Sequence, residues 1–277
     1  MSTVDVRATA APVRARDAGA VLERLRGRAP LVQCLTNLVV TGFTANALLA
    51  VGASPAMVDE ADEASELARA ADALLVNVGT PSEASAAAMR AAAHAAHAVG
   101  TPWVLDPVAV GPLTFRTRLA TDLLTKGPTV VRGNPSEVLS LAGAVGSARG
   151  VDSATDSASA LSAAFELAAR ESTTVAISGA VDYVTDGHSV IEIGTGHPLM
   201  TRVTGVGCVL GALVAACCAV EESPLLAASA ATAVLTVAAE VAVESSAGPG
   251  SFAVGLLDAL YSLDAEILDK HLAARAR

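Results

Sequence analysis

The chain has 277 residues, of which 52% are hydrophobic, 17% charged and 3% aromatic. This length suits one large α/β domain or two small ones, and the alanine-rich, aromatic-poor composition favours closely packed helices over a β-sandwich. The net charge of −10 at pH 7 argues against nucleic acid or an anionic membrane as a partner, so any anionic ligand must be held by local groups.

Strands and helices are predicted to alternate along the chain, after a disordered tail over residues 1–16. We expect strands at residues 31–36, 54–57, 73–78, 103–105, 129–132, 174–178, 181–185 and 189–193. We expect helices at residues 17–28, 43–51, 61–70, 82–99, 116–125, near 134, and at 157–171, 209–220 and 225–239. Residues 143–156, rich in Gly, Ser and Ala, are predicted to form a loop, and Asp186-Gly187 is typical of a two-residue hairpin turn.

This alternation predicts a single α/β domain over residues 17–277, with an open, mostly parallel sheet covered by helices on both faces. In such sheets, ligands bind at the carboxyl ends of the strands. The residues of interest all lie at or just beyond such ends: Asn37, Met57, Asn77, Asp106, Arg132 and Ser178. Their shared position predicts a ligand site at this edge of the sheet.

The four cysteines, Cys34, Cys208, Cys217 and Cys218, include no C-x-x-C pair, which indicates a reducing compartment and a cytoplasmic protein. Arginines near the N-terminus are followed by no apolar stretch, so no signal peptide is predicted. The apolar runs 209–220 and 225–239 are shorter than the roughly 20 residues that cross a membrane, and we expect both to be buried core helices.

Gly205 and Gly207 lie just before the apolar helix predicted at 209–220. Glycines let the backbone approach a ligand, and a helix N-terminus presents unpaired N–H groups and the positive end of its dipole, so this stretch suits a phosphate. Cys208 lies at the same point, where a helix N-terminus lowers the pKa of a thiol. The alternative is a tight loop into a core helix, because glycine motifs alone are weak signals.

Two acidic residues have both a metal-binding and a structural interpretation. Asp106 follows an apolar strand, where a carboxylate either holds Mg²⁺, directly or through water, or caps neighbouring N–H groups. Glu137 comes three residues after Asn134, with Pro135 between them, which is the pattern of a capping box at the start of a helix. The same geometry directs Glu137 towards a metal-bound water at the sheet edge, and Arg132 towards a phosphate.

Other signals are weaker or absent. Ser178 ends a predicted strand and either reaches a nucleotide phosphate or caps the following turn. A Walker motif is missing from the sequence, as is a Rossmann fingerprint after the first strand. The five histidines have no spacing typical of a metal site, and His94 and His97 are expected on the surface of an alanine-rich helix.

Taken together, several motifs resemble those of the hydroxyethylthiazole kinases, a family of the ribokinase-like superfamily. Most ribokinase-like kinases have an aspartate after the late Gly-x-Gly loop, where this chain has Cys208. The similarity runs from about Pro30 to Leu260. Its other motifs are Asn37-x-Val39, residues 45–57 (ANALLAVGASPAM), Asp106-Pro107-Val108, residues 132–137 (RGNPSE) and residues 181–187 (VDYVTDG).

The resemblance implies a ribokinase-like three-layer αβα fold and an enzyme of thiamine salvage. Such an enzyme uses ATP and Mg²⁺ to phosphorylate the hydroxyl of 4-methyl-5-(2-hydroxyethyl)thiazole. By matching motifs, Arg132, Ser178 and Gly207 are expected to bind ATP, and Asp106 and Glu137 are expected to serve Mg²⁺.

On the acceptor side, the resemblance implies that Met57 and Gly205 contact the thiazole and that Cys208 lies by the reacting hydroxyl. It also implies a homotrimer with sites at the subunit interfaces, in which Met57 serves a neighbour's site or its own.

The chain departs from the family pattern at three positions: Ser178 replaces threonine, Pro112 replaces a small flexible residue, and Val206 replaces threonine. Three other functions remain open at this point. They are a related kinase of another small heterocyclic alcohol such as a hydroxymethylpyrimidine, a nucleotide-binding regulator without turnover, and a ribokinase-like ATP-dependent dehydratase.

Overall fold

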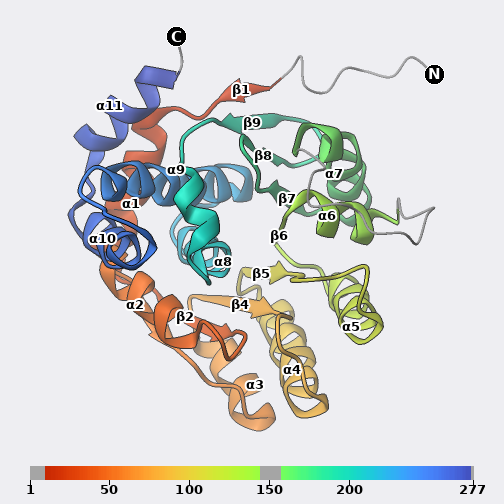
Figure 1. Cartoon of the computed structure of the whole chain (residues 1–277). Helices are drawn as coiled ribbons and strands as arrows, with labels where there is room; N and C mark the ends of the chain where they lie inside the picture. The colour runs from red at the N-terminus through yellow and green to blue at the C-terminus, as the bar shows by residue number, and fades with distance from the viewer. Residues whose placement is uncertain (1–9, 144–156, 276–277) are drawn as a thin grey trace, which may run out of the picture.

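One sheet runs through the protein in the computed structural model, which describes residues 10–143 and 157–275 (Figure 1). The strand order within these residues is β1-β9-β8-β7-β6-β5-β4-β2-β3, and only β8 runs antiparallel to its neighbours. The strands are β1 (Ala11–Pro12), β2 (Leu31–Leu35), β3 (Ser54–Ala56), β4 (Ala73–Asn77), β5 (Trp103–Asp106), β6 (Val130–Gly133), β7 (Thr174–Ile177), β8 (Asp182–Thr185) and β9 (Val190–Ile193). The predicted mostly parallel sheet is confirmed.

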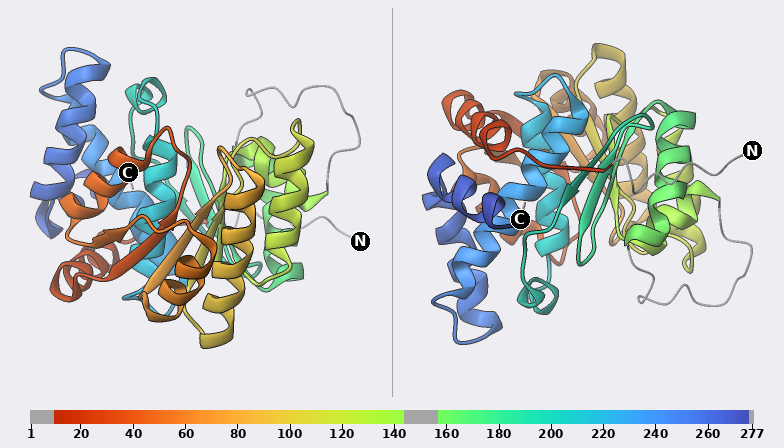
Figure 2. Two further views of the ribbon diagram at one scale, coloured as in Figure 1. Left: turned by 90° about the horizontal axis from the view of Figure 1, so that it is seen from below. Right: turned by 90° about the horizontal axis from the view of Figure 1, so that it is seen from above.

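Helices cover both faces of this sheet (Figures 1 and 2). One layer contains α1 (Ala15–Arg28), α2 (Thr41–Val51), α8 (Val206–Cys218), α9 (Pro224–Val243), α10 (Pro249–Ser262) and α11 (Ala265–Arg275). The other contains α3 (Ala61–Ala70), α4 (Glu83–Val99), α5 (Thr114–Leu124), α6 (Pro135–Ala142) and α7 (Ser157–Glu171). A short 3₁₀ helix, η2 (Pro198–Arg202), leads into α8. The expected three-layer αβα arrangement is therefore confirmed.

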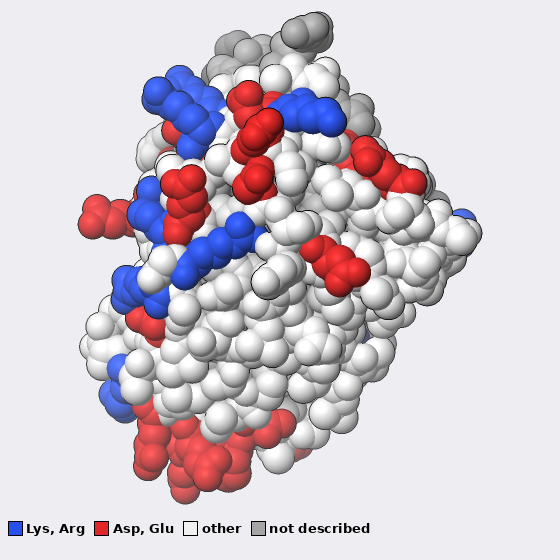
Figure 3. Space-filling model, turned by 90° about the vertical axis from the view of Figure 1, so that its left-hand side faces the viewer, with Lys and Arg blue, Asp and Glu red and all other residues white. Residues whose placement is uncertain are grey.

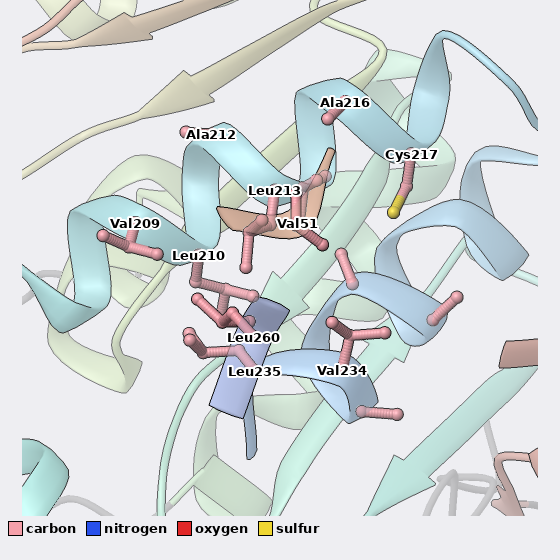
Figure 4. Close-up of a cluster of buried hydrophobic side chains, with 14 of the residues drawn as sticks. Val51, Val209, Leu210, Ala212, Leu213, Ala216, Cys217, Val234, Leu235 and Leu260 are labelled. Carbon is pink, nitrogen blue, oxygen red and sulfur yellow. The ribbon is translucent and has the colours of Figure 1, made fainter. Parts of the chain in front are cut away.

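The strands are apolar on both faces because both faces are covered. Along β5, Trp103 and Leu105 pack against the α3–α7 layer, whereas Val104 packs against the layer that contains α8. In that second layer, side chains of α8 and α9 such as Leu213 and Val234 meet in a dense cluster (Figure 4). Truncating a fully packed residue such as Leu213 to alanine is expected to cost about 2–5 kcal/mol of stability.

Helix α9 is longer than the sequence suggested, and its 20 residues reach the length and hydropathy of a membrane span. The argument that this apolar run is too short to cross a membrane was therefore wrong. The interpretation as a core helix is confirmed, because 78% of the apolar window of α9 is buried inside the protein and α8, α10 and α1 pack against it.

Several predicted boundaries differ from the structure. The tail expected over residues 1–16 is shorter, because Ala11–Pro12 pairs with β9 and α1 begins at Ala15; residues 1–9 lie outside the described residues. The loop predicted at 143–156 lies almost wholly outside them too. The β8–β9 turn is longer than two residues, because β8 ends at Thr185 and β9 begins at Val190.

The two edges of the sheet are formed by its shortest strands. Strand β1 pairs with β9 through only Ala11 and Pro12, and β3 pairs with β2 through Ser54, Pro55 and Ala56. Each edge strand thus contains one proline.

Candidate active site

A chain of buried polar side chains crosses the carboxyl edge of the sheet from β2 to β5. The Nδ2 of Asn37, just beyond β2, lies 3.1 Å from Oδ1 of Asn77, the last residue of β4. The Nδ2 of Asn77 donates to Oδ2 of Asp106, the last residue of β5, at 2.6 Å. Because β4 pairs with both β2 and β5, the strand ends bring these residues together as the sequence predicted.

Asp106 is a fully buried carboxylate with incomplete hydrogen bonding. Burial raises its pKa to about 7, although the nearby Arg132 charge lowers it. Its Oδ1 lies 3.6 Å from Nη1 of Arg132 and has no hydrogen-bond partner within the described residues, and the same is true of Arg132 Nε. Buried polar atoms without partners cost about 1–3 kcal/mol each, and they are typical of sites that complete their bonding with a ligand.

Arg132 joins this chain to β7 and to the start of α8. Its Nη2 donates to Oγ of Ser178, one residue beyond β7, at 2.9 Å. A Cβ added at Gly207 would lie 3.2 Å from Arg132 Nη1, so the missing side chain lets the guanidinium approach the first turn of α8. Two positive features, a guanidinium and a helix N-terminus, therefore converge at one point.

Helix α8 begins at Val206, three residues earlier than predicted, and its N-cap is Gly205. Gly205 has a φ of +99°, and a Cβ there would lie 2.8 Å from Cγ1 of Val40, so both backbone conformation and space require glycine. Because glycine has no side chain to cap the helix, the first N–H groups of α8 stay available to an anion. Gly207 and Cys208 consequently lie inside the first turn of the helix.

Cys208 receives a hydrogen bond at its sulfur from Nδ2 of Asn37, at 3.2 Å. The expected lowering of its pKa by the helix N-terminus is wrong. Burial raises the pKa of the thiol, the charge of Asp106 raises it further, and the amides of Asn77 and Asn37 and the charge of Arg132 lower it only in part. Cys208 is therefore a neutral thiol at pH 7.

Glu137 forms the predicted capping box with Asn134 at the start of α6. One carboxylate oxygen accepts from the N–H of Asn134 at 2.8 Å, and the other accepts from the N–H of Ala109 at 2.8 Å. Ala109 has a φ of 59°, a left-handed conformation that is uncommon for alanine, so Glu137 also fixes the strained loop after Asp106. Glu137 raises the pKa of Asp106 through its charge, which shows that the two carboxylates are close.

A cavity of about 620 Å³ opens beside Arg132, Ser178 and Gly207. Its wall includes the segments 178–182 and 195–201 and residues of α8 and α9. Asp182, which lines the cavity and accepts from the N–H of Gly179 at 2.8 Å, has its pKa raised to about 7 by burial. Sequence reasoning assigned no role to Asp182 or to 195–200, although the run Gly194-Thr195-Gly196-His197-Pro198 was a signal of unusual backbone.

Met57 lies one residue beyond β3, at the far side of the same edge, where it packs on the hydrophobic cluster that includes Val206 and Val209. It does not line the cavity described above. The carboxyl edge therefore has a cavity of about 620 Å³ near β6 and β7 and an apolar residue near β2 and β3, with Cys208 and Asp106 between them.

Comparisons with known proteins identify the family of the chain. The model of the hydroxyethylthiazole kinase family matches residues 22–266. The chain belongs to the hydroxyethylthiazole kinase family. A hydroxyethylthiazole kinase from Clavibacter sepedonicus is 53% identical over 248 residues, which are 90% of each chain.

Structural comparison places the fold in the same family. The structure of a hydroxyethylthiazole kinase protein from Pyrococcus horikoshii has a TM-score of 0.84 and 40% identity, and the match covers 91% of this chain and 95% of that one. A ribokinase-like superfamily protein from Enterococcus faecalis has a TM-score of 0.60 at 13% identity, over 86% and 88% of the two chains. The predicted family and its ribokinase-like fold are both confirmed.

Proposed function

We propose that this member of the hydroxyethylthiazole kinase family uses ATP to phosphorylate the hydroxyl of 4-methyl-5-(2-hydroxyethyl)thiazole, in thiamine salvage. The observation that carries the proposal is the position of the Arg132 guanidinium against Gly207, at the uncapped start of α8. Charge on a phosphoryl group in transfer is stabilised by fixed positive groups of this kind. The described residues share one sheet, which supports a single kinase domain.

ATP is assigned to the cavity beside β6 and β7. Arg132 and Ser178 line it with the backbone of Gly207, and together they offer a guanidinium, a hydroxyl and helix N–H groups to the phosphates. The apolar residues of the lining, which include Leu210, Leu235 and Met200, suit an aromatic base. The cavity volume of about 620 Å³ lies in the usual range for small-molecule sites.

Mg²⁺ fits the carboxylates at the sheet edge. No group of three or more His, Cys, Asp or Glu that could hold a metal is found within the part of the chain that the structure describes. Mg²⁺ is commonly held by one or two carboxylates, by waters and by substrate phosphates, and Asp106 with its unpartnered Oδ1 and the nearby Glu137 match that pattern. The ion would neutralise charge on the phosphates.

In the transfer step, the alcohol oxygen forms a bond to the γ-phosphorus while the bond from that phosphorus to the bridging oxygen of ADP breaks. Cys208, a neutral thiol in the first turn of α8, is assigned to contact the hydroxyl. Because the transition state of phosphoryl transfer is loose, the proton of the alcohol leaves late and no strong base is needed. Met57 and Gly205 are assigned to the thiazole ring.

We also propose a cytoplasmic homotrimer with the thiazole sites at its interfaces. All four cysteines are free thiols, which supports a reducing compartment. Leu38 and Val39, which follow Asn37, are 77% and 68% exposed, and Leu49 of α2 is 58% exposed. The face in Figure 3 has a broad uncharged area between charged regions, which supports subunit contact. Light scattering of the purified protein tests the trimer.

The experiment that tests the activity is ADP release with the thiazole alcohol, with a hydroxymethylpyrimidine as rival acceptor and with no acceptor as control. We expect the thiazole alcohol to give the highest kcat/KM. Preference for the pyrimidine would support the related kinase, and equal ADP release without any acceptor would contradict alcohol phosphorylation.

Arg132→Met is expected to raise the KM for ATP more than the KM for the alcohol, because Arg132 lines the nucleotide cavity.

A further inference from the structure

The amide of Asn77 lies in the middle of the polar chain, between Cys208, which is assigned to the acceptor, and Asp106, which is assigned to the metal. It is 0% exposed, and it does not line the nucleotide cavity. We infer that Asn77 is a positioning residue, which holds Asn37 with Cys208 on one side and Asp106 on the other, and so aligns the acceptor hydroxyl with the transferring phosphate. This inference rests on the proposed function and adds a residue to it.

The hydrogen bonds of Asn77 define which way its amide faces. Its Nδ2 donates to Oδ2 of Asp106 at 2.6 Å. Its Oδ1 accepts from the N–H of Gly79 at 2.9 Å and faces Nδ2 of Asn37 at 3.1 Å. In the opposite orientation, Oδ1 of Asn77 would face the Asp106 carboxylate, and its Nδ2 would face two other donors, the N–H of Gly79 and the Nδ2 of Asn37. The orientation in the structure is therefore strongly preferred.

Asn37 extends this constraint to the thiol. Its Nδ2 lies 3.1 Å from Asn77 Oδ1 and 3.2 Å from Cys208 Sγ, so one amide group connects the two residues. A Cβ at Gly79 would lie 2.8 Å from Cβ of Asn37 and 2.9 Å from Oδ1 of Asn77, so the close packing of the two amides depends on this glycine. Because the side chains are buried, small displacements of one are transmitted to the next.

This connection matters because the reactants approach from different strands. The acceptor side is near β2 and β3 and the phosphate side is near β5, β6 and β7, with Asn77 on β4 between them. A displacement of about 1 Å between reacting groups lowers turnover about 10²-fold. A purely structural Asn77 would instead affect stability, or affect both substrates alike.

The test is a double-mutant cycle of Asn77→Ser and Asn37→Ser, with Thr173→Val as the matched control. Thr173 is also buried and hydrogen-bonded, to the carbonyl of Pro128 at 2.7 Å, but it precedes β7 at the amino edge of the sheet. We expect Asn77→Ser to lower kcat by about 10–100-fold while the KM for ATP stays within about threefold. We expect the double variant to be no slower than the slower single variant, within about threefold, because the chain is already broken.

Three results would overturn the inference: an unchanged kcat in Asn77→Ser, a KM for ATP that rises in parallel with the loss of kcat, or single effects that simply multiply. Thr173→Val is expected to lose stability but to keep the wild-type kcat and KM. Should Asn77→Ser not fold, Asn77→Thr removes the same amide with a smaller loss of volume, and the same loss of kcat is expected from it.

A second readout does not depend on turnover. Cys34, Cys217 and Cys218 are buried, so iodoacetamide is expected to modify Cys208 first in the folded protein. Because the amides of Asn77 and Asn37 lower the pKa of Cys208, Asn77→Ser should slow its alkylation at pH 8 by about threefold or more, whereas Thr173→Val should not.

The two readouts separate the two proposals. A wild-type protein that releases no ADP with the thiazole alcohol, while Asn77→Ser still slows alkylation, would contradict the proposed function and keep only the connection of Asn77 to the thiol. A wild-type protein that turns over the alcohol, beside an Asn77→Ser variant that matches it in both readouts, would contradict the positioning role alone.

Discussion

The Cys208 thiol shows how burial decides the chemistry of one side chain. Its place in the first turn of α8 favours the thiolate, but burial and the charge of Asp106 outweigh that effect and raise its pKa. The sulfur also accepts a hydrogen bond from Asn37. In the proposed acceptor site, such a neutral thiol would contribute little as a base.

We therefore expect Cys208→Ala to lower kcat by no more than about 10²-fold, the low end of what general-base assistance contributes. Cys208→Asp should remain active, because the resemblance to ribokinase-like kinases implies that a carboxylate is compatible with this position. The measurement is steady-state ADP release at saturating ATP and thiazole alcohol, after circular dichroism has confirmed folding. An inactive, folded Cys208→Asp beside an unimpaired Cys208→Ala would identify Cys208 as a packing residue only.

Glu137 combines a structural and a proposed metal role. Glu137→Gln retains one acceptor oxygen but loses one of the two bonds to the N–H groups of Asn134 and Ala109. We expect a loss of about 1–3 kcal/mol in stability, together with a lower kcat and a higher Mg²⁺ concentration at half-maximal rate. The measurements are urea unfolding and ADP release across a Mg²⁺ titration.

Asn134→Ala is the control for Glu137→Gln, because it removes the N-cap of α6, at a cost of about 0.5–2 kcal/mol, without changing the carboxylate. If Asn134→Ala shifts the Mg²⁺ dependence as much as Glu137→Gln does, the role of Glu137 is capping alone.

The positions of the site residues could be predicted from the sequence, because apolar runs define where strands end and ligands bind at those ends. Their contacts could not. Asn37 and Asn77 are 40 residues apart, and they meet because β2 pairs with β4 and not only with β3, its successor in the chain. The local sequence patterns of the strands do not determine their order in a parallel sheet.

Among the elements, helix ends show the largest differences from prediction. Helix α8 was expected to begin at 209, where the apolar run begins, yet it begins at Val206 with Gly207, a residue of low helix propensity, inside its first turn. Tertiary packing overrides the propensity here, because the Arg132 guanidinium occupies the space that a side chain at position 207 would take. The capping box of α6, in contrast, was predictable, because it is encoded within four consecutive residues.

The C-terminal end of α1 provides a prediction about stability. Ala29, the exposed C-cap of α1, has φ 47° and ψ 57°, a left-handed conformation that glycine adopts more easily than alanine. We expect Ala29→Gly to raise the free energy of unfolding by about 0.5–1 kcal/mol, which corresponds to a rise in Tm of about 1–4 °C. Differential scanning calorimetry measures it.

Ala219→Gly is the matched control. Ala219 is the C-cap of α8 but is right-handed, with φ −68° and ψ −20°. At this position glycine relieves no strain and only increases the conformational entropy of the unfolded chain, so the Tm of Ala219→Gly should fall. A fall in both variants would show that backbone strain at Ala29 is not the limiting factor.

For the whole molecule, two buried carboxyl groups make stability depend on pH. Burial raises the pKa of Asp106 and of Asp182 from 3.8 to about 7. A carboxyl group with a raised pKa in the folded state contributes to the stability of the protein. This contribution is fully present below the pKa of the unfolded state, near 4, and is lost as the pH rises through about 7. These two groups therefore favour the ligand-free protein at pH 5 over pH 8.

Asp182→Asn removes one of these titrations while it keeps an acceptor for the N–H of Gly179. Urea unfolding at pH 5 and pH 8, without ligands, should show the variant gaining stability relative to the wild type as the pH rises. A constant difference between the two proteins across this range would contradict the raised pKa of Asp182.

The cavity to which ATP is assigned is a property of the whole fold. Its walls come from the ends of β6 and β7, the segment 195–201, and helices α8 and α9, which are separated by up to about a hundred residues in the sequence. No local pattern predicts such a cavity, and only the family resemblance indicated that ATP binds this chain.

The two prolines of the edge strands have a consequence for association between molecules. The N–H of Val13 donates to the backbone carbonyl of Glu192 of β9, and the N–H of Ser54 donates to the carbonyl of Pro30 next to β2. Successive backbone nitrogens of a strand face opposite sides, so those of Pro12 and Pro55 face outward, where any other residue would present a free N–H. Both rims of the sheet thus lack a donor at the position where a strand of another molecule would attach, which protects the protein from end-to-end polymerisation.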